Sequence, residues 1–361
     1  MNLKSYIFET MQILLLPFSI LYGMVVRFRN FLFDIGILKQ HTFKSIVINV
    51  GNLSAGGTGK SPHVIYLINQ LKSNYRLAVL SRGYGRQTKG FRWVKSDNSP
   101  LQVGDEPLQY AHLFPDLDVA VCEKRVVGIE QIEKEKKSEL ILLDDAFQHR
   151  YVKPDFNILI TDYSDLFYND HLLPLGRLRE PKSGVKRADV VIVSKSPENI
   201  NANEMQQIST KIKKYGVSQV VFSYMRYSES MEFLSGEKMP IAYLRNCNVI
   251  LVAGIANPKL FIEFATSVSK SVNEFIFKDH HPFSSGDMIK IKSEYNRLLR
   301  QNSPIVILTT RKDFMRFNTS ELKHLIQNLP LAFIDIEVCL QENTNCDLMG
   351  LIQHLIIQKN K

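Results

Sequence analysis

Short apolar runs rich in β-branched residues alternate with longer polar stretches after residue 44 of the chain. The stretch 124–137 is typical of these polar segments, because its apolar residues recur at the spacing of one helical face. The short runs are apolar at consecutive positions, which indicates strands buried on both faces by helices. The pattern predicts an α/β fold with a mostly parallel sheet covered by helices. The expected strands are SIVINV (45–50), LAVLS (77–81), DVAVC (118–122), LILLD (140–144), FNILIT (156–161) and DVVIVS (189–194).

A second series of apolar runs begins near residue 248 and predicts a second, smaller α/β lobe. Its longest polar segment with helical spacing covers 284–302. The stretch 225–247 between the two series is typical of a connector or hairpin. We therefore expect one domain at 45–224 and another at 248–361. The runs of the second series are VILVAG (249–254), FIEFAT (261–266), EFIFKD (274–279), PIVILTT (304–310) and LAFIDIEV (331–338).

The first 44 residues contain a run of sixteen uncharged residues, Met11–Val26. As a helix this run would be about 24 Å long, shorter than the roughly 30 Å hydrocarbon core of a bilayer. A buried helix, a short or tilted anchor and a helix lying in one leaflet all fit, and we expect membrane association. Arg27, Arg29, Lys39 and Lys44 follow the run, whereas one lysine precedes it. This asymmetry places the bulk of the chain on the cytoplasmic face of the inner membrane.

Composition narrows the class of protein. With 361 residues and 45% hydrophobic residues, the chain is large enough for two packed domains and is not a disordered protein. The formal net charge of +9 suggests an anionic partner, which could be a nucleotide, a nucleic acid or an anionic lipid. The four cysteines have neither a dense disulfide spacing nor a zinc-ligand spacing, which favours a reducing compartment.

A glycine-rich segment, GNLSAGGTGKS at 51–61, directly follows the first expected strand. In a phosphate loop, backbone amides and the start of the next helix bind phosphates. Lys60 would reach the β- and γ-phosphates, and the Ser61 hydroxyl would bind Mg²⁺. Ser54 stands where the strict motif has its first glycine, so the glycines after it would have to supply the permissive backbone. The expected nucleotide-binding residues are Ser54, Ala55, Gly56, Gly57, Thr58, Gly59, Lys60 and Ser61.

Two adjacent carboxylates, Asp144 and Asp145, close the expected strand at 140–144. Like charges at one strand end repel each other unless a cation neutralises them, so the pair predicts a Mg²⁺-linked role. A plain strand-to-loop transition would account for one aspartate, and less well for two. Gln148 and His149 follow within one turn, where they could orient a phosphate or a hydroxyl. A histidine at such a position is as often an ordinary helix-start or surface residue.

An enzyme that phosphorylates an alcohol needs a general base near the acceptor hydroxyl. The segment GDEP at 104–107 offers two carboxylates before a helix-like run, although acidic residues also favour helix starts for electrostatic reasons. The segment KDHHP at 278–282 is either an ordinary turn at a strand end or an aspartate with histidines that orient a base. Spacing alone does not bring residues 105 and 280 together.

Seven motifs follow one another along the chain: GNLSAGGTGKSP, LSRGYGR, VGDEP, LLDDAFQHR, LPLGRLREP, DHHPF and TTRKD. In this order they resemble the tetraacyldisaccharide 4′-kinase (lipid A 4′-kinase) family, from the N-terminus to about residue 315. The resemblance implies a membrane-bound, cytoplasm-facing enzyme with a P-loop NTPase-like sheet and a second α/β lobe. It also implies transfer of the γ-phosphate of ATP, with Mg²⁺, to the 4′-hydroxyl of an acylated glucosamine disaccharide 1-phosphate lipid.

The resemblance also implies roles for residues within the motifs. Asp105 matches the general base, and His280, in preference to His281, matches the histidine that polarises it. Lys60 completes the expected catalytic set. The residues implied around Mg²⁺ are Ser61, Glu106, Asp144 and Asp145. The residues implied around the acceptor and its phosphates are Tyr84, Arg86, Gln148, His149 and Arg179.

A membrane-associated P-loop switch ATPase is the alternative, because its glycine-rich loop and anchor would look similar. It predicts ATP hydrolysis stimulated by a protein, with no lipid acceptor. A nucleic-acid-binding ATPase fits less well, because the lysines and arginines are dispersed and the apolar N-terminal run would have no purpose. The expected partners are therefore the disaccharide lipid and the inner-membrane surface, with no nucleic acid and no obligate protein partner.

Overall fold

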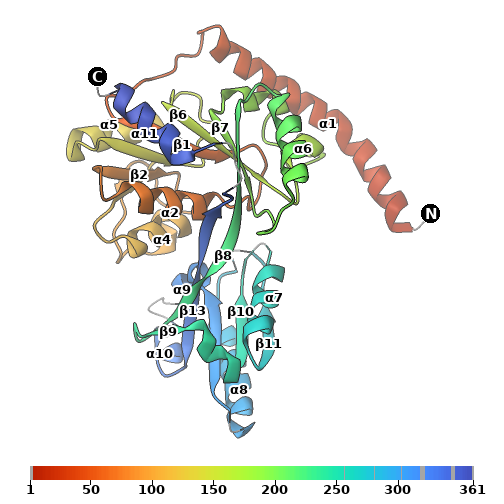
Figure 1. Ribbon diagram of the computed structural model, residues 1–361, viewed down its shortest axis with the longest axis vertical. Helices are drawn as coiled ribbons and strands as arrows, with labels where there is room; N and C mark the ends of the chain where they lie inside the picture. The colour runs from red at the N-terminus through yellow and green to blue at the C-terminus, as the bar shows by residue number, and fades with distance from the viewer. Residues whose placement is uncertain are drawn as a thin grey trace. The chain divides into compact units, whose positions relative to one another are not determined.

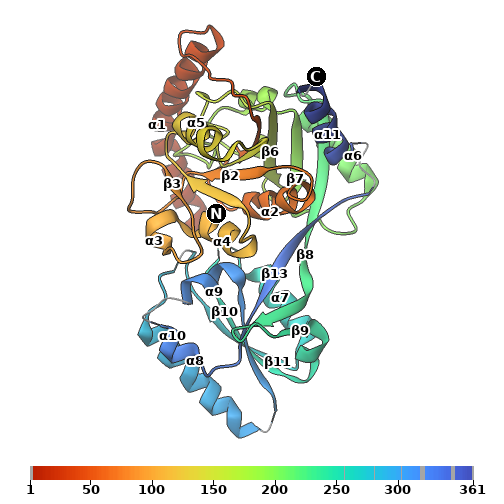
Figure 2. The same ribbon diagram turned by 90° about the vertical axis from the view of Figure 1, so that its left-hand side faces the viewer.

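The computed structural model describes residues 3–255, 257–279, 281–301, 303–317, 322–342 and 346–359. The chain forms two compact units, each drawn in Figures 1 and 2. Unit 1 consists of Met1–Ser96, Tyr110–Met225 and Val338–Lys361, and unit 2 consists of Asp97–Gln109 and Arg226–Glu337.

Unit 1 is built on a sheet with the strand order β8-β7-β6-β1-β5-β2-β4-β3. Apart from the antiparallel pair β3–β4, these neighbours are parallel, so the predicted mostly parallel sheet is confirmed. Val50 of β1 lies opposite Asp144 of β5, so the segments after these two strands leave the same edge of the sheet. The strands are β1 (Ile46–Asn52), β2 (Leu77–Ser81), β3 (Arg92–Trp93), β4 (Asp118–Val121), β5 (Leu140–Asp144), β6 (Phe156–Asp162), β7 (Val190–Ser194) and β8 (Gln219–Phe233).

Helices cover this sheet, and all seven residues of β1 are buried. Ile129 of α5 shares a core cluster with Leu143, and Ile212 of α6 shares another with Val191. Helix α2 is the next element after β1 and packs against β1 and β5. The helices of this part of the chain are α1 (Leu3–Asp34), α2 (Lys60–Leu71), α4 (Asp105–Leu113, which passes from unit 2 into unit 1), α5 (Arg125–Lys136), α6 (Ala202–Lys213) and α11 (Leu348–Lys359).

Unit 2 contains parallel strands in the order β11-β10-β12-β13. Strand β8 pairs with β9 in an antiparallel hairpin. The strands are β9 (Lys238–Pro240), β10 (Asn248–Ala253), β11 (Ser271–Ile276), β12 (Ile305–Thr310) and β13 (Leu331–Leu340). The helices are α3 (Pro100–Val103), α7 (Lys259–Val268), α8 (Ser285–Leu298), α9 (Arg311–Phe317) and α10 (Lys323–Ile326). Short 3₁₀ turns lie at Ile241–Asn246 and Leu299–Gln301 in unit 2, and at Phe167–Asn169 and Lys182–Arg187 in unit 1.

One expected strand is wrong: the run at 261–266 lies inside helix α7. Phe261 and Ala265 are its fully buried positions, and their separation of four residues puts them on one helical face. A short apolar run does not distinguish a buried strand from a buried helix face, which explains the error.

The units also differ from the domain limits expected at 45–224, 225–247 and 248–361. Strand β8 runs without a break through residue 225, and β13 carries the chain back so that Val338–Lys361 belongs to unit 1. The segment Asp97–Gln109 belongs to unit 2 although the chain on both sides of it belongs to unit 1. Apolar runs locate strands, but they do not show where a chain leaves one unit and returns to it.

Helix α1 spans 32 residues, twice the length of the uncharged run that predicted it. It is drawn in red in Figure 1. Its segment Leu14–Asp34 is long and apolar enough to cross a membrane, by length and composition. Pro17 lies inside the helix without ending it.

Candidate active site

The glycine-rich segment connects β1 to α2, and its conformation depends on Asn52, the last residue of β1. The Asn52 amide donates to the carbonyl oxygen of Ser54 at 2.7 Å and to the hydroxyl of Thr58 at 2.8 Å. Gly59 has φ +90°, a left-handed conformation that glycine adopts without strain, and α2 begins at the next residue. The helix N-terminus therefore directly follows the loop, as phosphate binding requires.

Neighbouring segments hold the outer side of this loop. Ala55 donates its backbone N–H to the carbonyl of Arg177 at 2.6 Å. At the end of β7, the Ser194 hydroxyl donates to the carbonyl of Thr58 at 2.6 Å. Lys195 donates to the carbonyl of Gly57 and forms an ion pair with Asp162 at 2.7 Å. Hydrogen bonds from Ser194 and Lys195 to loop carbonyls fix the loop from outside. This support offers a physical reason why Ser54 is tolerated where the strict motif has glycine.

Lys60, Asp145 and Arg179 form a charged cluster beside the loop. The Lys60 ammonium lies 3.2 Å from Asn52 Oδ1 and 3.8 Å from Asp145 Oδ1. Arg179 binds both oxygens of Asp145, at 2.7 and 3.1 Å, and also contacts the Asn52 side chain. Burial opposes ionisation of Asp145, but the charges of Lys60 and Arg179 hold the pKa of this carboxyl below its usual value. The cluster therefore contains an ionised carboxylate between two cations.

Asp144 points to different partners. It is 1% exposed and accepts hydrogen bonds from the Ser81 hydroxyl at 3.3 Å and the Tyr110 hydroxyl at 3.2 Å. Arg125, which is 2% exposed, donates to the backbone carbonyl of Asp144 at 3.4 Å. Burial lowers the pKa of Arg125 to about 10, which still leaves it charged at neutral pH. The two adjacent aspartates thus have separate environments, one bound by hydroxyls and one by cations.

Gln148 and Glu180 extend the cluster. Gln148 donates to the Asn52 carbonyl at 2.8 Å and to Glu180 at 2.9 Å. Glu180 is fully buried and forms an ion pair with Arg187 at 2.7 Å. Burial, together with positive charges that include Arg125, lowers the pKa of the neighbouring His149 to about 4. His149 is therefore a neutral imidazole at neutral pH, suited to hydrogen bonding rather than to carrying charge.

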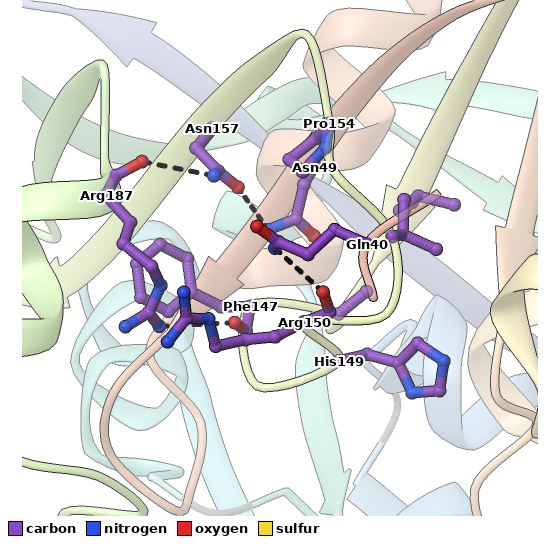
Figure 3. Close-up of a pocket in the computed structure, with 11 residues that line it drawn as sticks. Gln40, Asn49, Phe147, His149, Arg150, Pro154, Asn157 and Arg187 are labelled. Atoms are coloured by element: carbon purple, nitrogen blue, oxygen red, sulfur yellow. Dashed lines mark hydrogen bonds between the residues drawn. The ribbon is translucent and has the colours of Figure 1, made fainter. Parts of the chain in front are cut away.

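A small polar pocket is lined by residues of β1, of the segment that follows β5, and of β6 (Figure 3). Asn49 and Asn157 share a hydrogen bond of 2.8 Å inside it, and Gln40 donates to the backbone carbonyl of Arg150 at 2.8 Å. Its remaining labelled lining residues are Phe147, His149, Pro154 and Arg187. Asn49 and Asn52 lie on the same strand, but their side chains have different surroundings. Asn49 lines this pocket, whereas Asn52 contacts the glycine-rich loop.

The loop at Tyr84 and Arg86 is shaped by its own contacts. Arg86 donates to the carbonyl of Gly90 at 2.7 Å and pairs with Glu123 at 2.5 Å, and its side chain is only 4% exposed. Tyr84 at the tip is 76% exposed. Arg86 thus closes this loop, whereas Tyr84 is exposed to solvent.

In unit 2, Asp105 and Glu106 lie in the first turn of α4. Arg316 of α9 binds Asp105 Oδ2 through Nη2 at 2.7 Å and Nε at 3.2 Å. The same guanidinium reaches Asp313 at 2.9 Å. Asp313 is fully buried, and burial raises the pKa of its carboxyl. The Asp105 carboxylate is therefore held by Arg316 as well as by its place in the first turn of α4.

His280 lies outside the residues that the structure describes. Its neighbour His281 bonds to Asp287 at 3.0 Å and stacks on Phe277 with 4.6 Å between ring centroids. Asp287 also completes the cap of α8 together with Ser284. His281 thus participates in a local structural arrangement at the start of α8.

The sequence reading missed Asn52, Glu180, Ser194 and Lys195. Glu180 belongs to the LREP motif and Asn52 to the loop motif, yet neither was given a role. A charged residue that is fully buried needs a partner. Burial is therefore the property that marks Glu180, and only the fold shows it. Ser194 is 136 residues from the carbonyl it binds, and spacing gives no indication of that contact.

Comparisons with known proteins agree with this geometry. The family model of tetraacyldisaccharide-1-P 4′-kinase (LpxK) matches residues 11–353. A tetraacyldisaccharide 4′-kinase of Flavobacterium johnsoniae is 42% identical over 319 residues, covering 88% of this chain and 91% of that protein. One of Bacteroides thetaiotaomicron is 41% identical over 355 residues, covering 94% and 93%. A crystal structure described as "apo" form LpxK from Aquifex aeolicus in complex with ATP superposes with a TM-score of 0.73 at 28% identity, covering 97% of this chain and 99% of that one.

Proposed function

Because this chain belongs to the tetraacyldisaccharide-1-P 4′-kinase family, we propose that the cluster around Asn52 binds and activates ATP for transfer to a lipid. The reaction is ATP-dependent phosphorylation of the 4′-hydroxyl in lipid A biosynthesis. The acceptor is an acylated glucosamine disaccharide that carries a 1-phosphate. The observation that best supports this assignment of residues is the placement of Lys60 and Arg179 around one carboxylate beside the phosphate loop.

Most of the proposed site residues of unit 1 act on the nucleotide. Amides of the loop and the N-terminus of α2 bind the β- and γ-phosphates. Lys60 and Arg179 neutralise the charge that spreads over the phosphate oxygens in the transition state. Asp145 keeps both cations in place when no nucleotide is bound, and ATP competes with this carboxylate for them. Gln148 and His149 offer neutral hydrogen-bonding groups to the acceptor.

In unit 2, Asp105 is the general base and removes the proton of the 4′-hydroxyl as the bond to phosphorus forms. The bond between the γ-phosphorus and the β-γ bridging oxygen breaks, and ADP leaves with that oxygen. His280 polarises Asp105. The engagement of His281 with Asp287 and Phe277 supports this choice between the two histidines. Tyr84, which is exposed, contacts the sugar, whereas the contacts of Arg86 favour a role in shaping its loop.

Mg²⁺ accompanies ATP in this reaction. The available donors suit this ion, because Ser61 offers a hydroxyl and Glu106, Asp144 and Asp145 offer carboxylates. Among the described residues no cluster of three His, Cys, Asp or Glu side chains forms. Mg²⁺ usually keeps several waters and takes only one or two carboxylates besides phosphate oxygens, so such a cluster is not required. When bound, Mg²⁺ would neutralise charge on the phosphates.

Helix α1 attaches the enzyme to the cytoplasmic face of the inner membrane. Leu14, Phe18, Leu21, Val25 and Phe28 follow one another at intervals of three or four residues, and each is more than half exposed. Such spacing puts them on one side of the helix, where they present a continuous apolar surface. Because the acceptor is a lipid, an enzyme held at the bilayer meets it where it resides.

The test is transfer of label from [γ-³²P]ATP to purified tetraacyldisaccharide 1-phosphate in mixed detergent micelles. The wild-type chain should place label in the organic extract, and Lys60→Met should reduce this by at least about 10²-fold because it removes transition-state charge stabilisation. Release of labelled inorganic phosphate without a labelled lipid would instead indicate an ATPase. Equal transfer by Lys60→Met would contradict the role of Lys60.

A further inference from the structure

Helix α1 has a second face, which packs against the rest of unit 1. Leu14 and Leu21 belong to its exposed apolar side, whereas Ser19, Gly23 and Val26 are buried positions on another side of the helix. Ser19 donates its hydroxyl to the backbone carbonyl of Leu172 at 2.9 Å. This docking face carries polar side chains, and several of them end on the loops that form the nucleotide cluster.

Tyr22 provides the most direct of these contacts. Its hydroxyl donates to the backbone carbonyl of Arg179 at 2.7 Å. The backbone N–H of Arg179 in turn donates to the carbonyl of Leu53 in the phosphate loop at 2.8 Å. The peptide backbone of Arg179 is thus held on one side by the membrane helix and on the other by the loop. Its guanidinium meanwhile binds Asp145.

A second connection runs through the segment that carries Gln148 and His149. The next residue, Arg150, donates to the backbone carbonyl of Asn30 at 2.9 Å and pairs with Asp34 at 2.8 Å, at the end of α1. The side chain of Arg150 is only 6% exposed. Arg29 adds a longer contact to the carbonyl of Gln148 at 3.4 Å.

We propose that α1 is a positioning element of the kinase as well as its anchor, with Tyr22 as the positioning residue for Arg179. The proposal rests on the proposed function, because it assigns α1 to the bilayer and Arg179 to the phosphates. One rigid helix then has a lipid-facing side and a side that fixes two catalytic loops. A displacement of α1 would move the backbone of Arg179 and the segment at 148–150 together, so the cluster is fully formed only when the helix is seated.

The test compares two substitutions on the docking face, Tyr22→Phe and Ser19→Ala. Each removes one hydroxyl that bonds to a backbone carbonyl, but only Tyr22 contacts a residue of the nucleotide cluster. Phenylalanine keeps the aromatic ring in its packing. Tyr22→Phe should lower kcat by about fivefold or more, the factor expected for one lost hydrogen bond, with KM for ATP unchanged. Ser19→Ala should stay within about twofold of wild type.

Binding to the membrane is measured separately, by flotation with vesicles of phosphatidylethanolamine and phosphatidylglycerol. Tyr22→Phe should float with the vesicles like the wild-type chain. Leu21→Ala, on the lipid-facing side, should float less while keeping its kcat in detergent micelles. An unchanged kcat in Tyr22→Phe, or an equal loss in Ser19→Ala, would overturn the positioning role. Failure of the wild-type chain to label the lipid would instead contradict the proposed function.

Discussion

Arg316 holds the carboxylate of Asp105 through two of its nitrogens, Nη2 at 2.7 Å and Nε at 3.2 Å from the same oxygen. The guanidinium is only 8% exposed and is itself fixed by the buried Asp313 and by the carbonyl of Gly254. Charge-assisted hydrogen bonds of this kind fix orientation as well as position. Asp105, the proposed base, is therefore held in one orientation by residues of its own unit.

Replacing Asp105 with asparagine should remove the base while keeping an oxygen that can accept from Arg316. We expect kcat to fall by about 10²–10⁴, the range for loss of a general base, with equilibrium binding of ATP nearly unchanged. Single-turnover transfer and calorimetric titration with ATP measure the two quantities. Asp97→Asn, an exposed change in the same segment, should behave like the wild type. A fully active Asp105→Asn enzyme would rule out Asp105 as the base.

Asp145 should make the stability of the protein depend on pH. Positive charges hold its pKa in the folded chain below the value of about 3.9 expected in the unfolded chain. The ionised carboxylate therefore stabilises the folded state above about pH 4, and this contribution is lost as pH falls through the folded-state pKa. Asp145→Asn should lower Tm at neutral pH, and the difference from wild type should shrink as the pH is lowered below about 4.

Thermal unfolding followed by circular dichroism over a pH series measures this difference. The exposed residue Asp116 supplies a matched control, since Asp116→Asn removes one carboxylate that forms no ion pair with any residue the structure describes. A constant Tm difference between Asp145→Asn and wild type from neutral to acid pH would show that the charge of Asp145 contributes nothing to stability.

Ser194 and Ser196 test whether the phosphate loop is held from outside. Each hydroxyl is buried and donates to a backbone carbonyl, that of Thr58 in the loop for Ser194 and that of Ser223 for Ser196. Ser194→Ala should raise the Kd for ATP by about fivefold. Without this bond the free loop samples more conformations, and binding ATP must then restrict them. Ser196→Ala should lower Tm about as much as Ser194→Ala does, but it should leave the Kd for ATP unchanged. Equal Kd values for ATP in both variants would contradict the role of Ser194 in holding the phosphate loop.

Local sequence patterns were enough to predict most of the strands and the phosphate loop. Strands at 77–81 and 140–144 match β2 and β5 to the residue, because continuous apolar runs with clear polar ends define both limits. The place of Asp144 and Asp145 at the end of a strand also follows from the local sequence, because the apolar run stops at Asp144. The sequence could not show that Asp144 and Asp145 have different partners, because Tyr110 and Arg179 reach them from distant parts of the chain.

The same limit applies to the supporting residues. Asn52 was read as a member of a glycine-rich loop, whereas its side chain is the point where loop, Lys60 and Arg179 meet. A buried asparagine at the end of a strand carries no sequence signal that separates it from Asn49 three positions earlier. Contacts that depend on the fold of several segments become visible only once those segments are placed.

The two asparagines of β1 therefore provide the sharpest test of the cluster. Both are buried, at 0% exposure for Asn52 and 2% for Asn49, and both are bonded through the side-chain amide. Asn52→Ala removes bonds to the carbonyl of Ser54, to Thr58, to Lys60 and to Arg179. At about 1 kcal/mol for each bond, kcat/KM for ATP should fall by roughly 10³-fold.

Asn49→Ala removes the bond to Asn157 in the polar pocket and leaves the loop untouched. It should lower the free energy of unfolding by about 1–3 kcal/mol, the usual range for a buried polar group that loses its partner, while kcat/KM stays within about twofold. Urea unfolding and steady-state transfer assays on the two variants separate these effects. A loss of activity in Asn49→Ala as large as that in Asn52→Ala would mean that the whole strand, rather than the cluster at its end, controls the reaction.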